Sequence, residues 1–113
     1  MLHECDINVE ESDELIRIEI IGDLTASAEN RMGEILERMD VSKVGKILVV
    51  FDGISLINSA GIAIMIDLVI KSQESNRKLF FSGVSTHFCK IFELVGLTQY
   101  ASIVSSEDEI KDI

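Results

Sequence analysis

The chain has 113 residues and a formal charge of −10, because 20 Asp and Glu oppose 10 Lys and Arg. Its hydrophobic content of 47% supports one packed domain over residues 1–113 and excludes a disordered, collagen-like or coiled-coil chain. The acidic balance argues against nucleic acid and anionic membrane as partners, since both require clustered Lys and Arg to offset phosphate charge.

The first elements are predicted to form an antiparallel hairpin. Apolar and polar residues alternate over residues 3–9 and again over residues 15–20, with a polar, turn-forming run between them. The start of the chain shows no basic segment followed by an apolar one, which predicts a protein without a secretory signal that resides in the cytoplasm.

Residues 25–40 are predicted to form an amphipathic helix capped by Asp23 or Thr25, because apolar residues recur at helical spacing. Residues 46–51 are continuously apolar, as expected of a central parallel strand covered on both faces, and this strand is expected to end at Asp52 and Gly53.

Strands and helices alternate over the remainder of the chain. A helix is expected over residues 60–72, a strand over 78–82, a helix from Ser85 to Gly96, a strand over 100–104 and a short helix after Ser106. No proline interrupts this order. The sequence therefore predicts an α/β fold: a mixed sheet of four to five strands, opening with a β-hairpin, with about four helices packed against it.

The helix over residues 60–72 has two apolar sides. The side expected to pack on the sheet carries Ile62, Met65, Ile66, Val69 and Ile70. The opposite side begins with small and apolar residues where a solvated helix would carry charge; it holds Ala60, Ala63, Ile64, Asp67 and Lys71. This second side is either a partner interface or a surface that another helix of the same domain covers.

Ser59 is expected at or next to the N-cap of that helix. Its hydroxyl would then satisfy a backbone N–H of the first turn. The same position suits a phosphate group, because a helix N-terminus stabilises an anion. A phosphoserine there would add up to about two negative charges beside the small apolar side.

The sequence resembles the STAS domains, and in particular the bacterial anti-sigma factor antagonists. That family carries a motif close to Asp-x-Ser-x-x-x-x-Asp-Ser-Ser-Gly-Leu, which corresponds here to Asp52, Ile54-Ser55 and the run from Asn58 to Ile62. Further matches are the run Gly22-Asp23-Leu24, residues 46–52 and residues 91–97. The resemblance spans nearly the whole chain.

The resemblance implies a switch that is not an enzyme and needs no cofactor or metal. The unphosphorylated antagonist binds an anti-sigma factor that is also a serine kinase, the kinase phosphorylates the antagonist to release it, and a PP2C-like phosphatase resets it. Carried onto this chain, the phosphoacceptor is Ser59, and Asp23 and Asp52 are expected in loops close to it. The residues expected to contact the partner are Asp23, Asp52, Asn58, Ala60, Gly61, Ala63, Ile64 and Asp67.

Two departures from the family motif leave alternatives open. Asn58 stands where Asp is usual, and Ala60 stands where Ser or Thr is common. A chain that is not phosphorylated would be a constitutive binder, or a ligand-binding STAS subunit of another regulatory assembly. The chain is expected to be a monomer or a weak dimer.

Two rival functions come from other classes. A receiver domain would phosphorylate Asp52, but it needs a pair of acids after the first strand and a Lys after the last, which this sequence does not place. An enzyme using His87 or Cys89 lacks an acid partner and a phosphate-binding loop. Cys5 and Cys89 lack metal-binding or redox spacing and are interpreted as ordinary thiols.

Overall fold

Five strands form one mixed sheet in which spatial order follows sequence order. The computed structural model describes residues 5–41 and 43–110. Strand β1 pairs antiparallel with β2, and each later strand pairs parallel with the one before it. The strands are β1 (Asp6–Glu11), β2 (Ile16–Leu24), β3 (Lys46–Ile57), β4 (Lys78–Ser82) and β5 (Ala101–Val104).

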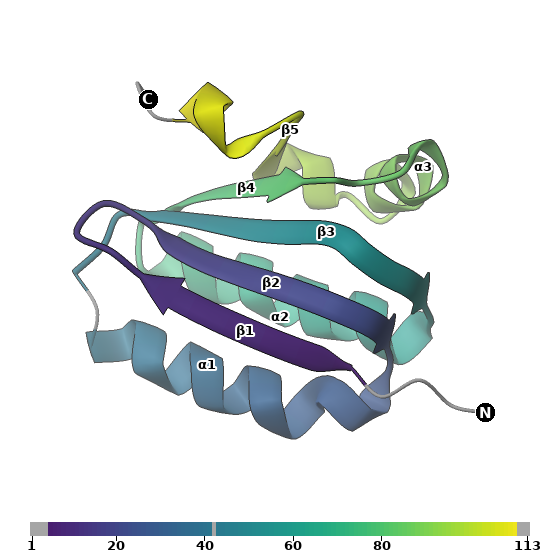
Figure 1. Cartoon of the computed structure of the whole chain (residues 1–113), viewed down its shortest axis with the longest axis horizontal. Helices are drawn as coiled ribbons and strands as arrows, with labels where there is room; N and C mark the ends of the chain where they lie inside the picture. The colour runs from purple at the N-terminus through teal and green to yellow at the C-terminus, as the bar shows by residue number, and fades with distance from the viewer. Residues whose placement is uncertain (1–4, 42, 111–113) are drawn as a thin grey trace.

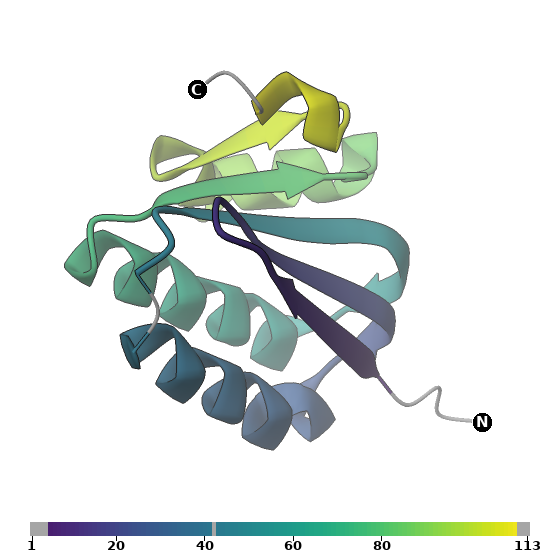
Figure 2. The same cartoon turned by 60° about the vertical axis from the view of Figure 1, so that its left-hand side comes forward.

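The helices gather on one face of this sheet (Figure 1). They are α1 (Glu29–Val41), α2 (Ser59–Glu74) and α3 (Thr86–Leu94), joined by the 3-10 turns η1 (Ala26–Ala28), η2 (Leu97–Gln99) and η3 (Glu107–Ile110). Because the parallel strands are added in one direction, each right-handed crossover places its helix on the same side. Figure 2 shows α1 and α2 side by side along the sheet.

The side chains of the sheet divide into two apolar clusters. Ile47, Val49 and Phe51 of β3 belong to the large cluster that the helices cover, where the rings of Phe51, Phe81 and Phe92 meet with centroids 5.1–5.6 Å apart. Leu48 and Val50 alternate with them and belong to a smaller cluster with Phe80 and Ile110. The turn η3 therefore packs against the face of the sheet opposite the helices.

Most predicted elements are confirmed. The hairpin, the alternation of helix and strand and the left-handed residue Gly96 after α3 are all present, with φ of Gly96 at +83°. Thr25 accepts a hydrogen bond from Ser27 N and caps η1, which leads into α1. The short terminal helix is the 3-10 turn η3, in which Glu109 accepts hydrogen bonds from the backbone N–H groups of Ser105 and Ser106. Residues 3 and 4 of the first predicted strand lie outside the described residues.

The predicted end of the central strand at Asp52 and Gly53 is wrong. Strand β3 continues to Ile57, and its register with β2 shifts twice, so that β3 contains two more residues than the β2 segment it follows. Such bulges bend a strand and increase its twist without ending it. Asp-Gly, usually a turn signal, here lies within a bulged strand.

The predicted orientation of α2 is partly wrong, although Met65 and Val69 are buried as expected. Ile64 is 4% exposed and belongs to the large core cluster, whereas Ile66 and Ile70 are 36% and 50% exposed. The buried side is a helical series: Gly61, Ile64, Met65, Leu68, Val69 and Ser72. Because apolar residues occupy nearly all of residues 61–70, periodicity alone allowed both orientations.

Arg77 has a structural role that no local sequence pattern indicates. Its side chain is buried, and its guanidinium donates to the carbonyl oxygens of Met39 at 2.6 Å and Val44 at 2.8 Å. The charge therefore meets the C-terminal end of α1, where carbonyl groups lack helical partners. Arg77 ties that end of α1 to the start of β4.

No helix in the described part of the chain is long and apolar enough to cross a bilayer.

Candidate functional site

The N-terminus of α2 is held against the carboxyl end of β2 (Figure 1). The backbone N–H of Asn58 donates to the carbonyl oxygen of Leu24 at 3.3 Å. A Cβ atom at Gly61 would lie 2.1 Å from that same oxygen, so only glycine allows this approach. These contacts fix where the first turn of α2 emerges.

Asn58 is the N-cap of α2. Its Oδ1 accepts a hydrogen bond from the backbone N–H of Gly61 at 3.0 Å, and its own carbonyl accepts from Ile62 N at 3.0 Å. An Asp side chain makes the same cap with the same oxygen. The departure from the family motif at this position therefore preserves the geometry and removes one negative charge.

Ser59 is the first residue of α2 and is exposed. Its hydroxyl makes no hydrogen bond within residues 5–41 and 43–110, because Asn58 already caps the helix. Ala63 and Asp67 follow at intervals of four residues and are also exposed, so the three side chains lie along one stripe of the helix. The half-buried side chain of Ala60 adjoins Ser59 in the same turn.

Asp23 lies within β2 and not in a loop, opposite Leu56 of β3 and next to the Leu24 carbonyl that receives Asn58. It is half-buried. Cys5 lies close by, immediately before β1: burial, together with the carboxylates of Asp6 and Asp23, raises the pKa of the Cys5 thiol above its ordinary value of 9.0. No local sequence pattern connects Cys5 with this region, since the connection depends on the pairing of β1 with β2.

Asp52 does not join this group. It lies within β3, five residues before the strand ends, a distance of roughly 16 Å along an extended chain. Its neighbour is Gly83, where a Cβ atom would lie 2.2 Å from Asp52 Oδ1. Asp52 is exposed beside the turn between β4 and α3, and the expectation that it lies in a loop is wrong.

Two of the predicted contact residues, unlike Asp52, are buried. Gly61 is buried against Leu24, and Ile64 is buried in the core. Of the predicted site residues, those that remain accessible at this end of α2 are Asn58, Ser59, Ala60, Ala63 and Asp67, with the half-buried Asp23 beside them.

Cys89 and His87, the other candidate reactive side chains, make contacts typical of structural residues. The thiol of Cys89 donates to the carbonyl of Val84 at 3.8 Å, and His87 is an exposed residue whose ring lies 5.6 Å from that of Phe88. In the described residues no group of three or more His, Cys, Asp or Glu side chains could hold a metal ion. The antiparallel first pair and the sequential strand order also differ from the doubly wound order 2-1-3-4-5 of receiver-type folds.

Comparison with known proteins supports the same fold. Residues 6–110 match the family model described as STAS domain. No curated protein matches the chain.

Solved structures cover nearly the whole length of the chain. The anti-sigma factor antagonist SpoIIAA in its unphosphorylated form is similar, with a TM-score of 0.78 and 18% identity over 95% of both chains. The Bacillus cell fate determinant SpoIIAA in its phosphorylated form has a TM-score of 0.75 and 18% identity over 95% of this chain and 98% of its own. A variant of RsbS from Moorella thermoacetica has a TM-score of 0.81 and 10% identity over 94% and 92%.

Proposed function

The chain belongs to the STAS domain family, and we propose that it acts as an anti-sigma factor antagonist whose binding is switched by phosphorylation of Ser59. The observation that carries this proposal is that the Ser59 side chain is exposed and makes no hydrogen bond within the described residues. Its hydroxyl is exposed at the start of α2 and is not needed for the cap, so a phosphate can be added without breaking a native hydrogen bond. The first-turn N–H groups and the helix dipole favour the added charge.

The partner in this proposal is an anti-sigma factor that is also a serine kinase. It contacts the exposed end of α2 around Asn58, Ser59, Ala60 and Ala63, with Asp23 beside them. A phosphate on Ser59 would project from this surface and would have to be desolvated at the interface, which lowers affinity. A PP2C-like phosphatase restores the binding form, and the switch operates in the cytoplasm without a catalytic residue in this chain.

A second candidate function rests on Asn58 and Ala60. If a kinase requires the charge of an Asp before the acceptor, the protein is a constitutive STAS binder and is regulated elsewhere. The Asn58 cap is compatible with both the switched antagonist and the constitutive binder. Only a measurement of phosphate on Ser59 distinguishes them.

The first prediction concerns Ser59→Asp. We expect this substitution to leave the fold intact, because an acidic residue in the first turn of a helix is favourable by about 0.3–1 kcal/mol. We expect partner affinity to fall at least about tenfold, equivalent to about 1.4 kcal/mol. The measurement is calorimetric titration against each serine-kinase anti-sigma factor of the organism that encodes the chain, combined with mass spectrometry of the protein after incubation with that kinase and ATP.

Two variants control this experiment. Thr86→Asp makes a comparable change at the first residue of α3, where the hydroxyl is also exposed, and should not alter binding. Ser59→Ala should bind the partner and accept no phosphate. Unchanged affinity of Ser59→Asp would refute the switch, and partner binding without any phosphate on Ser59 would favour the constitutive binder.

A further inference from the structure

A groove of about 440 Å³ runs between α1 and α2, immediately beyond Ser59. Its walls are Glu29, Asn30 and Gly33 of α1 and Ala63, Ile64 and Asp67 of α2. Both helices begin at the same edge of the sheet and lie side by side (Figure 2). The groove therefore opens beside the residues to which we assign partner binding, and its volume falls within the range of roughly 300–1,000 Å³ typical of binding pockets.

The depth of the groove comes from small residues. A Cβ atom at Gly33 would meet nothing within 4 Å, and Ala63 is an exposed residue facing the same space. The floor is apolar, because Met32 and Ile64 are 2% and 4% exposed. An aliphatic side chain inserted here would be removed from water without displacing a hydrogen-bonded group.

The rim of the groove is acidic. Glu29 and Asp67 are exposed and stand on opposite helices, and no Lys or Arg is among the residues that line the groove. Lys71 lies one turn beyond Asp67, outside the lining. An apolar floor between two carboxylates complements an aliphatic anchor flanked by cationic side chains.

We propose that this groove binds a basic amphipathic segment of the protein partner, with an aliphatic side chain over Gly33 and Ala63 and a Lys or Arg beside Glu29 and Asp67. The inference rests on the proposed function, because it describes the partner of the same end of α2. A second copy of this chain does not suit the groove, since a surface of net charge −10 offers few cations to the acidic rim.

The test is an NMR titration of the isotope-labelled full chain with designed helical peptides of about 18 residues, or five helical turns. One peptide contains Leu, Ala and Lys in an amphipathic pattern, and its partner replaces every Lys by Glu. The Lys peptide should shift the amide signals of Gly33, Ala63 and their neighbours, with a Kd of about 1 mM or tighter. The Glu peptide should leave them unchanged.

Four variants separate the groove from general attraction to an acidic protein. Ala63→Leu fills the groove without changing charge and should weaken the Lys peptide at least about tenfold, whereas Gln73→Leu on an exposed part of the same helix should not. Asp67→Lys should weaken binding at least about tenfold, whereas the same charge reversal at the exposed Glu93 of α3 should change the Kd less than about threefold.

Several outcomes would overturn the proposal. They are the absence of shifts at Gly33 and Ala63, equal shifts with the Glu peptide, and an Ala63→Leu variant that binds as the native chain does. Self-association that Ala63→Leu abolishes in sedimentation velocity would assign the groove to a second copy instead.

The two proposals fail in different ways. Ser59 does not line the groove, so Ser59→Asp should change the Kd of the Lys peptide less than about twofold while weakening the whole partner. Loss of the peptide result alone refutes the groove assignment. Loss of the Ser59→Asp effect on the partner alone refutes the switch.

Discussion

Gly61 is a residue at which the structure tolerates no side chain. It carries the first turn of α2 past the carbonyl oxygen of Leu24, with the Cγ2 atom of Ile57 3.0 Å from where its Cβ would be. Neither the backbone oxygen nor the end of β2 can move away without disturbing the sheet. The glycine of the family motif therefore has a steric role in this chain.

We expect Gly61→Ala to lower the free energy of unfolding by about 2–3 kcal/mol, the upper part of the range of about 1–3 kcal/mol for overpacked cores. Gly33→Ala is the matched control: its Cβ enters open space within α1, and it should raise stability by about 0.5–1 kcal/mol. Urea denaturation of both variants measures the difference. A Gly61→Ala variant as stable as the native chain would mean that α2 lies farther from β2 than the structure has it.

Cys5 provides a pH-dependent probe of the region around Asp23. Because burial and two carboxylates raise its pKa above 9.0, the thiol should be alkylated by iodoacetamide with a half-maximal rate above pH 9.0. The proton is held more tightly in the folded state, so the stabilisation is present below pH 9 and is lost as the pH rises through the folded pKa. Peptide mapping of a Cys89→Ser variant isolates the reaction.

Asp23→Asn is the informative partner variant in that experiment. Removal of one negative charge should move the pH midpoint of Cys5 alkylation downward, toward the value of 9.0. An unchanged midpoint would show that burial and Asp6 raise the pKa of Cys5 and that Asp23 lies too far away to contribute.

At the scale of elements, α2 is the helix that joins core and site. One side of α2 packs on the sheet, another forms the groove with α1, and its N-terminus presents Ser59. Ile66 and Ile70 remain exposed on a further side. The helix is apolar almost all round, and its position depends on contacts with the strands more than on its own periodicity.

We expect Ile64→Glu to unfold the domain or reduce its stability by more than about 4 kcal/mol, since an unpaired carboxylate would enter the core. This result is opposite to that for a surface contact residue, which would retain a native circular dichroism spectrum. Ile70→Glu, with the same chemistry at a residue that is 50% exposed, should change stability by less than about 1 kcal/mol. Thermal melts of the two variants compare them, and a native melt for Ile64→Glu would refute the burial of Ile64.

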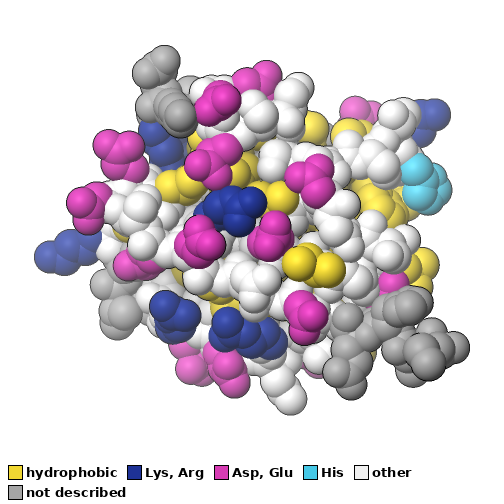
Figure 3. All heavy atoms as spheres, in the orientation of Figure 1, with side chains coloured by type: hydrophobic (Ala, Val, Ile, Leu, Met, Phe, Trp, Pro, Cys, Tyr) yellow, Lys and Arg dark blue, Asp and Glu magenta, His cyan; other side chains and the backbone are white. Residues whose placement is uncertain are grey.

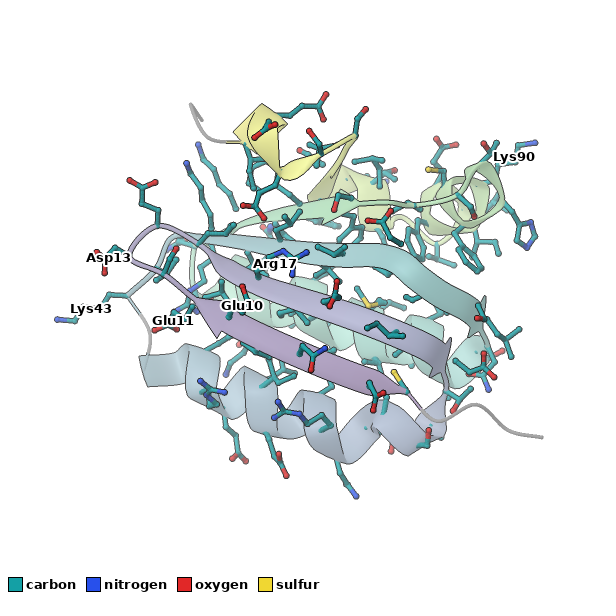
Figure 4. All side chains as sticks on the ribbon, viewed as in Figure 1. Glu10, Glu11, Asp13, Arg17, Lys43 and Lys90 are labelled. Carbon is teal, nitrogen blue, oxygen red and sulfur yellow. The ribbon has the colours of Figure 1, made fainter. Side chains whose placement is uncertain are left out.

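At the scale of the molecule, charged side chains are dispersed, but acidic residues outnumber basic ones by 20 to 10. Acidic side chains predominate over basic ones on the face shown in Figure 3, and no basic patch is visible there. Arg17 stands opposite Glu10 in the β1–β2 register (Figure 4) and forms ion pairs with Glu19 at 3.6 Å and Glu107 at 3.3 Å. The ion pair with Glu107 connects β2 to the turn η3 across the sheet.

The net charge of −10 should make the fold more stable as salt rises, because repulsion among the carboxylates is screened over a Debye length of about 10 Å at 0.1 M. We expect the urea midpoint to increase between about 0.02 M and 0.5 M NaCl. A double variant, Glu74→Lys and Glu93→Lys, reduces the net charge at two exposed helical residues and should show a smaller increase. A midpoint that falls with salt would show that ion pairs such as those of Arg17 outweigh the repulsion.

Much of the fold could be predicted from the sequence because the signals are local. Alternation in the hairpin, the apolar run of residues 46–51 and the glycine after α3 depend on neighbouring residues, and each is confirmed. The family motif also located Ser59 at the first turn of a helix without reference to any other element.

The remainder depended on contacts between distant residues. The bulges that extend β3 to Ile57, the burial of Ile64, the position of Asp52 beside Gly83 and the groove between α1 and α2 all follow from how β2, β3 and the helices meet. Because the α2 sequence is apolar on nearly every side, it predicts that the helix is buried. It does not indicate which side of the helix faces the core. The close approach of Gly61 to the Leu24 carbonyl selects one orientation, because a steric constraint of this kind exists only when the two segments are packed together.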